Sequence, residues 1–432
     1  MKLIVNYENH VLKNLVLKVL TIAISICANA QTEKTPIKGD INDDGVVNVA
    51  DIVEIVNIIM NESEYEDTSC DVGSVKYNDT IIIDTPYKKI KVIENTAAKQ
   101  IADLYNFFRI PSAVITNAGT ILVAYENRKE LWDKGIIDIL LSRESKDGYL
   151  IKKLFFNSNT TSRSMNPIFL IDREGCQGKP GRIYLFTCYL DMQSYATQNT
   201  HETSDFVYKY SDDDGVTWSP EYSLKKYWDT EKYSIVIPSA ANGIVDDYGT
   251  FIIPTMVVKD GKWRSGLAFK KVNCDWCFST PTPCDGDSES TVYIDKDGRI
   301  ILDCRVDDAN IRRKYIYDMY GDFYTKIPDE PSVPLPLKAE IHKCIINGQE
   351  VYLLSYVDSQ NNLRENITLY ASTDAMKWNK VARLQNGDLQ VSAYSNVYSY
   401  SNKTIFTYEN NYEIKIMDIS ALNDVIIQTS MK

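Results

Sequence analysis

The sequence lacks several features that would place it in a common functional class. It has only three histidines, and none of them lies near the pair Cys274 and Cys277, so we do not expect a zinc site there. No stretch is rich in lysine or arginine, which argues against nucleic acid as a partner. Beyond the first 30 residues no apolar run is long enough to cross a bilayer, so no transmembrane helix is predicted.

The N-terminus has the pattern of a secretory signal. Three lysines precede an apolar run at residues 19–27, and Ala28-Asn29-Ala30 supplies the small residues of a cleavage site. The run is too short to span a membrane. We therefore predict a signal peptide over residues 1–30, and a secreted, periplasmic or cell-surface location.

Most of the negative charge is concentrated in one short segment. The chain has a net charge of −12, and residues 33–67 hold ten acids and two lysines, a net of −8. Within this segment oxygen-bearing side chains alternate, a glycine stands where a calcium loop turns sharply, and apolar residues then recur at helical spacing over 49–60. The predicted calcium ligands are Asp40, Asn42, Asp44, the backbone carbonyl of Val46, Asn48 and Asp51.

The segment 36–62 resembles one repeat of a dockerin, the calcium-binding module that docks on cohesins. Dockerins normally carry two such repeats, and no second one is found here. The resemblance therefore implies a small α-helical calcium-loop module, while a cohesin-like partner stays open. The alternative is a solvated acidic turn, which the agreement between the loop and the following helix pattern disfavours. The polar, acidic residues 63–77 are predicted to form a linker.

From residue 78 onward short strand patterns alternate with turn residues. Hairpin patterns occupy residues 112–125, 291–304 and 395–408. Many short strands joined by tight turns are typical of a sandwich, a barrel or a propeller. The sequence alone thus predicts an all-β domain over residues 78–432.

One turn pattern distinguishes among these architectures. Residues 211–218, Ser-Asp-Asp-Asp-Gly-Val-Thr-Trp, resemble the aspartate box, a hairpin turn that recurs once per blade in sialidase-type propellers. Residues 372–378 are similar but shorter and lack the glycine, and residues 142–148 are a third, eroded candidate. The resemblance implies a six-bladed β-propeller. It carries no functional information, since the same box occurs in propellers that bind without catalysing.

Three arginines extend the resemblance to the bacterial exo-α-sialidases. Arg109 lies in an Arg-Ile-Pro motif, Arg305 ends a strand pattern, and Arg364 precedes another. In that family three arginines hold the carboxylate of sialic acid, and a planar bidentate guanidinium suits this task better than an ammonium group. The resemblance implies that Arg109, Arg305 and Arg364 bind the substrate carboxylate.

The family's catalytic acid lies in a loop a few residues after an acid-x-Arg motif. Here Glu126-Asn127-Arg128 matches the motif, and Asp133 takes the position of the acid, with Trp132 beside it to lower the local polarity and raise its pKa. Glu130 is the alternative acid, because loop lengths vary. Arg128 is expected to line the pocket near the sugar ring.

Sialidases attack with tyrosine, whereas most glycosidases use a carboxylate. A charged nucleophile would be repelled by the substrate's own carboxylate, and a neutral phenol is not. A carboxylate must then accept the phenol proton. Tyr394 matches the family's nucleophile and Glu289 its partner, although the family usually has asparagine where this chain has Ser288.

The prediction is a secreted retaining exo-α-sialidase that hydrolyses terminal sialic acid from sialylated glycans through a tyrosyl intermediate, with no cofactor for catalysis. A trans-sialidase would use the same residues. A non-catalytic sialic-acid-binding propeller would need only the arginines. The presence of every catalytic residue type favours an enzyme.

Overall fold

A computed structural model describes residues 107–432, with internal gaps, and the backbone of three short strands that precede them. The gaps are residues 132, 134, 145–149, 157–161, 192–203, 308, 310, 319, 329–336, 359–363, 365, 385–393 and 411–412. The chain divides into two compact units, Met1–Glu66 with Glu94–Thr96 and Asp67–Ile93 with Ala97–Lys432. The second unit contains almost all of the described residues. The predicted signal peptide and calcium loop lie outside them, and the last three residues of the predicted linker form β1.

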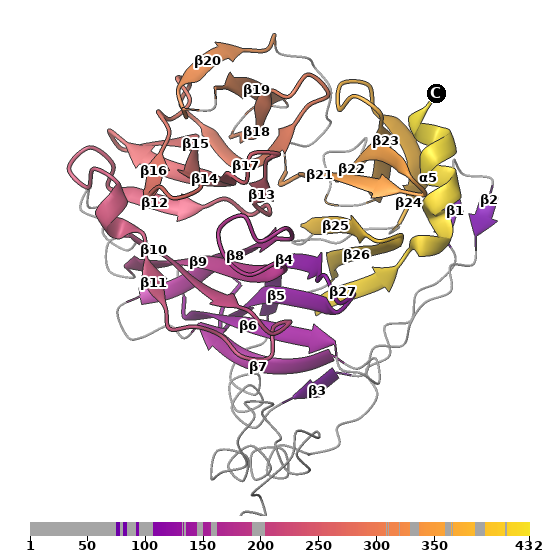
Figure 1. The fold of residues 1–432 in the computed structure, drawn as a ribbon, viewed down its shortest axis with the longest axis horizontal. Helices are drawn as coiled ribbons and strands as arrows, with labels where there is room; N and C mark the ends of the chain where they lie inside the picture. The colour runs from indigo at the N-terminus through magenta and orange to yellow at the C-terminus, as the bar shows by residue number, and fades with distance from the viewer. Residues whose placement is uncertain are drawn as a thin grey trace, which may run out of the picture. The chain divides into compact units, whose positions relative to one another are not determined.

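The second unit is a six-bladed β-propeller, as the sequence predicted (Figure 1). Each blade is one antiparallel sheet. Blade 1 contains β4 (Phe107–Ile115), β5 (Ile121–Arg128), β6 (Ile137–Glu144) and β7 (Leu150–Phe156), with β3 (Val92–Glu94) next to β7. Blade 2 contains β8 (Ser162–Asp172), β9 (Arg182–Asp191), β10 (Ser204–Ser211) and β11 (Tyr222–Ser223). Blade 3 contains β12 (Ile235–Pro238), β13 (Ile244–Val245), β14 (Phe251–Lys259), β15 (Lys262–Lys270) and β16 (Trp276–Phe278).

The other three blades follow the same order along the chain. Blade 4 contains β17 (Asp287–Ile294), β18 (Ile300–Val306), β19 (Arg312–Tyr317) and β20 (Phe323–Lys326). Blade 5 contains β21 (Glu340–Ile346), β22 (Gln349–Val357), β23 (Ile367–Ser372) and β24 (Asn379–Arg383), extended by β1 (Val75–Tyr77) and β2 (Ile81–Ile83). Blade 6 contains β25 (Ser395–Tyr400), β26 (Lys403–Asn410) and β27 (Glu413–Asp418).

The strands are buried because the blades stack face against face. All eight residues of β5 are buried, and apolar side chains of blades 1, 2 and 6 form one continuous cluster. A sheet covered on both faces needs apolar side chains on both, which explains why these strands read as apolar runs instead of alternating patterns. Stacking fixes the six inner strands around a common axis, and the inner strand β4 lies beside both β8 and β25.

Within the described part of the chain, helical structure is confined to short elements. The helix α5 (Asn423–Ser430) follows the single turns η1 (Lys225–Tyr227) and η2 (Ser420–Leu422) in sequence, and it packs against β23 and β24 of blade 5 (Figure 1). The sequence analysis did not identify this helix. Among the described residues, no helix is both long and apolar enough to cross a bilayer.

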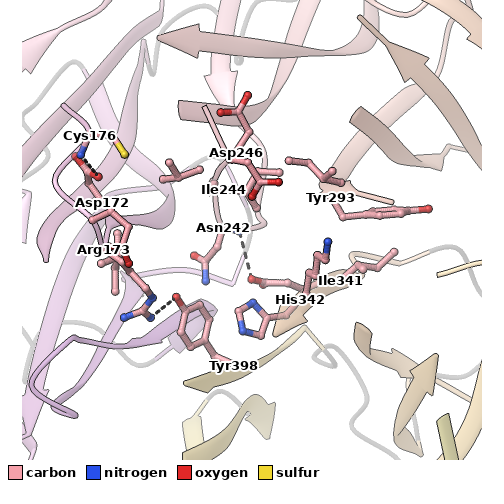
Figure 2. Close-up of a pocket in the computed structure, with 18 residues that line it drawn as sticks. Asp172, Arg173, Cys176, Asn242, Ile244, Asp246, Tyr293, Ile341, His342 and Tyr398 are labelled. Carbon is pink, nitrogen blue, oxygen red and sulfur yellow. Dashed lines mark hydrogen bonds between the residues drawn. The ribbon is translucent and has the colours of Figure 1, made fainter. Parts of the chain in front are cut away.

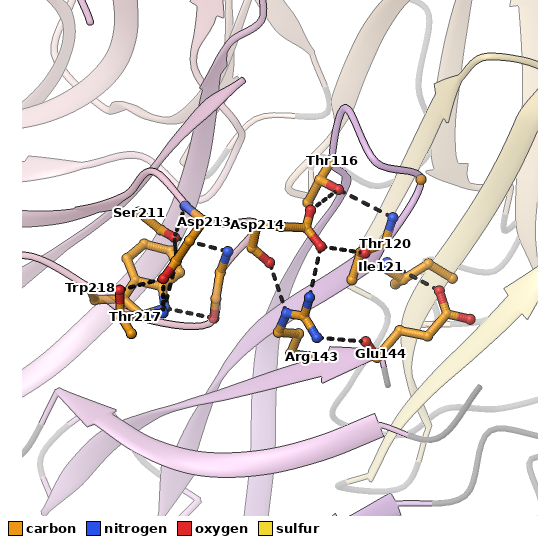
Figure 3. Close-up of polar contacts among 12 residues, drawn as sticks. Thr116, Thr120, Ile121, Arg143, Glu144, Ser211, Asp213, Asp214, Thr217 and Trp218 are labelled. Carbon is orange, nitrogen blue, oxygen red and sulfur yellow. Dashed lines mark hydrogen bonds and ion pairs between the residues drawn. The ribbon is translucent and has the colours of Figure 1, made fainter. Parts of the chain in front are cut away.

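The segment that resembles an aspartate box forms the turn after β10 (Figure 3). The Ser211 hydroxyl donates to Asp213 at 2.7 Å and accepts from the amide of Gly215 at 2.9 Å. The amide of Thr217 donates to Asp213 at 2.9 Å. Gly215 has a φ of 82°, which a glycine adopts without strain. In the shorter turn over 372–378 Ala375 takes this left-handed conformation, with a φ of 58°.

Asp214 in the same turn ties blade 2 to blade 1 (Figure 3). Its carboxylate accepts hydrogen bonds from the hydroxyls of Thr116 and Thr120 in the β4–β5 turn. The Arg143 guanidinium of β6 donates to the same carboxylate at 2.7 Å and to the backbone oxygen of Asp214 at 2.8 Å. The turn therefore acts as a link between blades, besides closing its own hairpin.

We expect Asp214→Ala to lower the free energy of unfolding by about 2 kcal/mol, because three donors on blade 1 lose their acceptor. Chemical denaturation measures this change. Asp212→Ala is the matched control: Asp212 pairs with Arg182 on the surface of the same blade, and its loss should cost less than about 1 kcal/mol. Equal effects of the two substitutions would contradict the inter-blade role.

Candidate active site

Six of the seven predicted binding and catalytic residues line one pocket of about 190 Å³ at one end of the propeller axis. The inner strands explain this convergence. Arg109 lies near the start of β4, Glu289 near the start of β17, and Tyr394 directly precedes β25. Because each inner strand begins at the same end of the axis, residues almost 300 positions apart in sequence come together. The pocket-lining members of the predicted set are Arg109, Arg128, Asp133, Glu289, Arg305 and Tyr394.

Tyr394 and Glu289 form a hydrogen-bonded pair in the pocket wall. The Tyr394 hydroxyl donates to one oxygen of Glu289, and Arg305 Nη1 donates to the other at 2.6 Å. Arg305 Nη1 also donates to the Tyr394 oxygen at 3.2 Å. Burial and the negative charge of Glu289 raise the pKa of the Tyr394 hydroxyl well above its usual range, despite the opposing charges of Arg305 and Arg109. The phenol is therefore protonated at neutral pH, with a carboxylate already placed to accept its proton.

The three predicted arginines surround Tyr394. The guanidinium carbons of Arg109 and Arg364 lie 5.4 and 5.9 Å from the centre of its ring, and Arg305 bonds its hydroxyl. Three guanidinium groups around one small volume make a strong site for an anion, and a carboxylate matches their planar donor geometry.

Glu409 on β26 holds this arrangement together, and the sequence analysis missed it. One oxygen of its fully buried carboxylate accepts from the Ile110 amide at 2.8 Å and from Arg109 Nε at 3.3 Å. The other oxygen accepts from the Tyr394 amide at 3.2 Å. Burial alone would lower the pKa of Arg109, but Glu409 and Tyr394 raise it above its usual range. The sequence signal was an acid within the apolar strand pattern Ile405-Phe406-Thr407-Tyr408-Glu409.

We expect Glu409→Gln to lower the free energy of unfolding by about 3 kcal/mol or more and kcat/KM by at least about tenfold. The glutamine side chain is neutral, so the Arg109 guanidinium would lose its buried counter-charge. The glutamine NH2 group would also face the backbone N–H of Tyr394, which needs an acceptor. Denaturation and a rate assay on one preparation measure both effects. Glu350→Gln, which breaks an exposed pair with Lys343, should change stability by less than about 1 kcal/mol. An unaltered unfolding curve for Glu409→Gln would contradict the role of Glu409.

A second buried pair supports the loop that carries the predicted acid. Glu126 is fully buried against Arg128, and it also accepts from the Asn166 amide at 2.9 Å. Burial raises the pKa of the Glu126 carboxyl, and Arg128 opposes this shift. Arg128 Nη1 extends from this pair to Asp133 Oδ1 at 2.6 Å and to the backbone oxygen of Leu131 at 3.1 Å.

The structure separates the two candidate acids. The Asp133 side chain is 53% exposed and lines the pocket, whereas Glu130 is not among the pocket-lining residues. The side chain of Glu130 lies beside Gly135, where an added methyl group would come within 3.4 Å of its Cβ. Geometry therefore favours Asp133 as the proton donor. Trp132, the residue predicted to lower the polarity around Asp133, lies outside the described residues.

Two further features of the pocket had no predicted counterpart. Ser288, which stands where the family has asparagine, donates to Asp307 at 2.9 Å, and Asp307 lies 3.6 Å from Arg305 Nε. The pocket also has an apolar wall, whose side chains pack together beside the buried residues Arg163 and Asn166. This apolar wall consists of Met165, Leu190, Ile237, Met256 and Trp263.

The described residues contain no group of three or more histidine, cysteine, aspartate or glutamate side chains arranged to hold a metal ion. The seven cysteines within them have free thiols. The predicted calcium ligands between Asp40 and Asp51 fall outside these residues and stay a prediction.

Comparison with known proteins gives matches over most of the propeller. A family model described as a BNR repeat-like domain matches residues 116–407. A sialidase from Clostridium perfringens is 27% identical over 228 residues, 49% of this chain and 58% of that protein. A sialidase from Paraclostridium sordellii is 25% identical over 350 residues, 73% of this chain and 84% of that protein. The chain thus spans little more than half the length of the Clostridium perfringens relative.

Two solved structures have the same fold. Trypanosoma rangeli sialidase, as a covalent intermediate with 2,3-difluorosialic acid, has a TM-score of 0.64 at 16% identity, covering 85% of this chain and 58% of that one. The intramolecular trans-sialidase from Ruminococcus gnavus, in complex with oseltamivir carboxylate, has a TM-score of 0.58 at 13% identity, covering 74% of this chain and 96% of that one. At these identities the similarity concerns the fold.

Proposed function

The chain belongs to the family of BNR repeat-like domains, and from this premise we propose that it is a retaining exo-α-sialidase that releases terminal sialic acid from glycoconjugates. The observation that carries the proposal is the Tyr394–Glu289 pair enclosed by three guanidinium groups. A site that bound sialic acid without catalysis would need the arginines but not a buried phenol bonded to a carboxylate. The names of the two curated relatives support the same activity.

The arginines fix the substrate by its carboxylate. Sialic acid carries this group on the anomeric carbon itself, so an anion held by Arg109, Arg305 and Arg364 places the reacting carbon beside the Tyr394 oxygen. Orientation of this kind supplies much of the rate enhancement in enzymes. The apolar wall of the pocket, with Met256 and Trp263, suits the N-acetyl group, since its methyl gains from leaving water.

Bond formation and proton transfer then follow from the geometry. As the Tyr394 oxygen attacks the anomeric carbon, its proton moves to Glu289. The bond from that carbon to the leaving oxygen breaks, and Asp133 protonates the leaving group. Water attacks the tyrosyl intermediate from the vacated side, Asp133 accepts its proton, and Glu289 returns the first proton to Tyr394. Two inversions give net retention.

A trans-sialidase is the second candidate, because a sugar hydroxyl can take the place of water in the last step. The Tyr394–Glu289 pair and the arginines of the pocket would serve both reactions. Product analysis separates the two activities.

The test is incubation with a fluorogenic aryl α-sialoside, followed by NMR of the products. Retention predicts that the α-anomer of free sialic acid appears first. The β-anomer as first product would refute retention, an anhydro or transferred sugar would indicate transfer, and no turnover on any α-sialoside would leave a binding protein.

We expect Asp133→Asn to affect natural and activated substrates differently. A natural glycoside needs protonation of its leaving oxygen, while an aryl sialoside with a good leaving group does not. The variant should therefore lose at least about tenfold more activity on the natural substrate than on the aryl sialoside. Parallel kcat/KM measurements on both substrates test this. Glu130→Gln is the matched control, and a selective defect in that variant instead would make Glu130 the acid.

We also propose that residues 1–30 direct export and that Asp40, Asn42, Asp44, Val46, Asn48 and Asp51 bind a structural calcium ion. The alternating oxygen ligands with Gly45 at the turn support calcium, and the lone dockerin-like repeat leaves a cohesin-like partner unassigned. Catalysis in this proposal uses no cofactor.

A further inference from the structure

A second and larger cavity, of about 480 Å³, has Asp172, Asn242 and Tyr398 in its lining (Figure 2). It lies at the other end of the propeller axis. The strand direction establishes its position. The pocket described above contacts Met165 near the start of β8 and Tyr394 before β25, whereas this cavity contacts Asp172 and Tyr398 toward the ends of the same strands. At about 3.3 Å per residue along a strand, the two are separated by most of the thickness of the propeller.

A buried polar cluster forms part of the wall of the second cavity. Asn242 accepts from the Ser112 hydroxyl at 2.5 Å and donates to the backbone oxygen of Ala113 at 3.1 Å. The backbone N–H of Asn242 donates to the Glu340 carboxylate, which also accepts from buried Lys338 at 3.0 Å. These side chains are buried, and the two cavities share no lining residue, so the second cavity is a separate site. Its volume lies within the range usual for small-molecule sites.

The charge of the second cavity disfavours anions. Five carboxylates and two cationic side chains contribute to its lining. Both cations already have partners: Arg173 donates to the Ile115 backbone oxygen and the Tyr398 hydroxyl, each at 2.9 Å, and Lys343 pairs with Glu350 at 3.1 Å. A sialic acid or another carboxylate would therefore be repelled here.

Two exposed tyrosines lie on turns of identical construction, and one of these turns borders the cavity. Tyr248 is 77% exposed and Tyr320 is 72% exposed. Each follows the pattern Asp-x-Tyr-Gly, in which the aspartate carboxylate accepts from the tyrosine amide, at 2.9 Å for Asp246 and 2.8 Å for Asp318. The aspartate caps hold both rings out on rigid backbone. Asp246 and its neighbour Asp247 themselves line the cavity, which places Tyr248 at its rim.

A continuous surface joins the two tyrosines. Gly249, next to Tyr248, lies against the turn that follows β15. A methyl group added at Gly249 would come within 3.1 Å of Val272 in that turn. Val272 is itself 38% exposed, and the ammonium group of its neighbour Lys271 lies 4.3 Å from the centre of the Tyr320 ring. Tyr248, Val272 and Tyr320 therefore form one exposed group of apolar side chains beside the charged residues Asp247 and Lys271, a composition found at ligand-binding surfaces.

We propose that the second cavity and its rim, with Tyr248 and Tyr320, bind a neutral saccharide, as a glycan is after its sialic acid has been removed. The ring face of a tyrosine covers the apolar face of a pyranose, and its hydroxyl together with Asp247 offers hydrogen bonds to sugar hydroxyls. The acidic lining excludes the sialylated form. The identity of this ligand rests on the proposed function, and the site would keep the enzyme on a glycoprotein surface that it has already processed.

The experiment measures binding of asialofetuin and of N-acetyllactosamine to the full chain and to the double variant Tyr248→Ala/Tyr320→Ala. We expect both probes to bind the wild type, and the double variant to bind at least about tenfold more weakly, since each ring removes stacking contact. An excess of free sialic acid should not compete. Thermal unfolding checks that the double variant is folded.

Ile345→Ala is the matched control, because Ile345 is 63% exposed on another blade and should not alter binding. Equal affinity of wild type and double variant, absence of binding by the wild type, or competition by sialic acid would overturn the proposal. Hydrolysis of an aryl sialoside is measured in parallel. If hydrolysis is absent while N-acetyllactosamine still binds through the two tyrosines, the proposed enzyme function fails and this saccharide site stands.

Discussion

Replacing Tyr394 with phenylalanine is expected to lower kcat/KM on an aryl sialoside by about a thousandfold or more, although the change removes a single oxygen atom. That oxygen is the proposed nucleophile, and the Tyr394–Glu289 hydrogen bond positions it. The ring, which is 5% exposed and lies near Arg109 and Arg364, would keep its packing. A large loss of rate with little loss of stability is therefore the expected signature.

The matched control is Tyr317→Phe. Tyr317 is equally buried, at 2% exposure, and its hydroxyl donates to the backbone oxygen of Thr280 at 3.0 Å within the body of the propeller. Its loss should lower stability by about 1 kcal/mol and leave the rate within about twofold. If Tyr394→Phe kept a tenth of the wild-type rate, or if trapping with a 3-fluorosialyl substrate labelled another residue, the tyrosyl mechanism would be wrong.

The fold could be predicted from local patterns because those patterns are set by neighbouring residues. The hairpins at 112–125, 291–304 and 395–408 correspond to β4–β5, β17–β18 and β25–β26, and turn residues between strand patterns are visible in any short window. Blade stacking then places the start of every inner strand at one end of the axis. This is why Arg109, Glu289 and Tyr394 could be expected to converge without knowledge of their distances.

Interactions between blades were not predictable in this way. The contact of Glu409 with Arg109 joins residues 300 positions apart, and it depends on the register in which β26 meets β4. The same holds for Asp214, whose partners lie on the neighbouring blade. It also holds for Asp307, which meets Ser288 through the pairing of β17 with β18. An acid in a strand pattern is ordinarily solvated, and only the fold reveals that Glu409 is buried beside a guanidinium. The C-terminal helix α5 was missed for another reason, because eight residues offer a weak periodic signal.

Glu289→Gln is expected to be nearly as damaging as the loss of the nucleophile, with a fall of about a thousandfold in kcat/KM. The amide cannot accept the phenol proton, and it no longer neutralises Arg305, which lies 2.6 Å from the carboxylate. Glu289→Asp keeps the charge but withdraws it by one methylene, so an intermediate loss is expected. Asp307→Asn removes a second negative charge near Arg305, at 3.6 Å, without removing the base, and should cost less than about tenfold.

The pH dependence of the residual rate distinguishes a missing base from a general disturbance of charge. Burial and the charge of Glu289 raise the pKa of Tyr394 in the wild type, so its phenol does not ionise by itself near neutral pH and must transfer its proton to Glu289 during attack. In Glu289→Gln the proton must leave to hydroxide, and the residual kcat/KM should therefore rise with pH between about 6 and 9. A flat profile in Glu289→Gln, or a loss no larger than that of Asp307→Asn, would mean that Glu289 acts only through the charge of Arg305 and that another group accepts the proton of Tyr394.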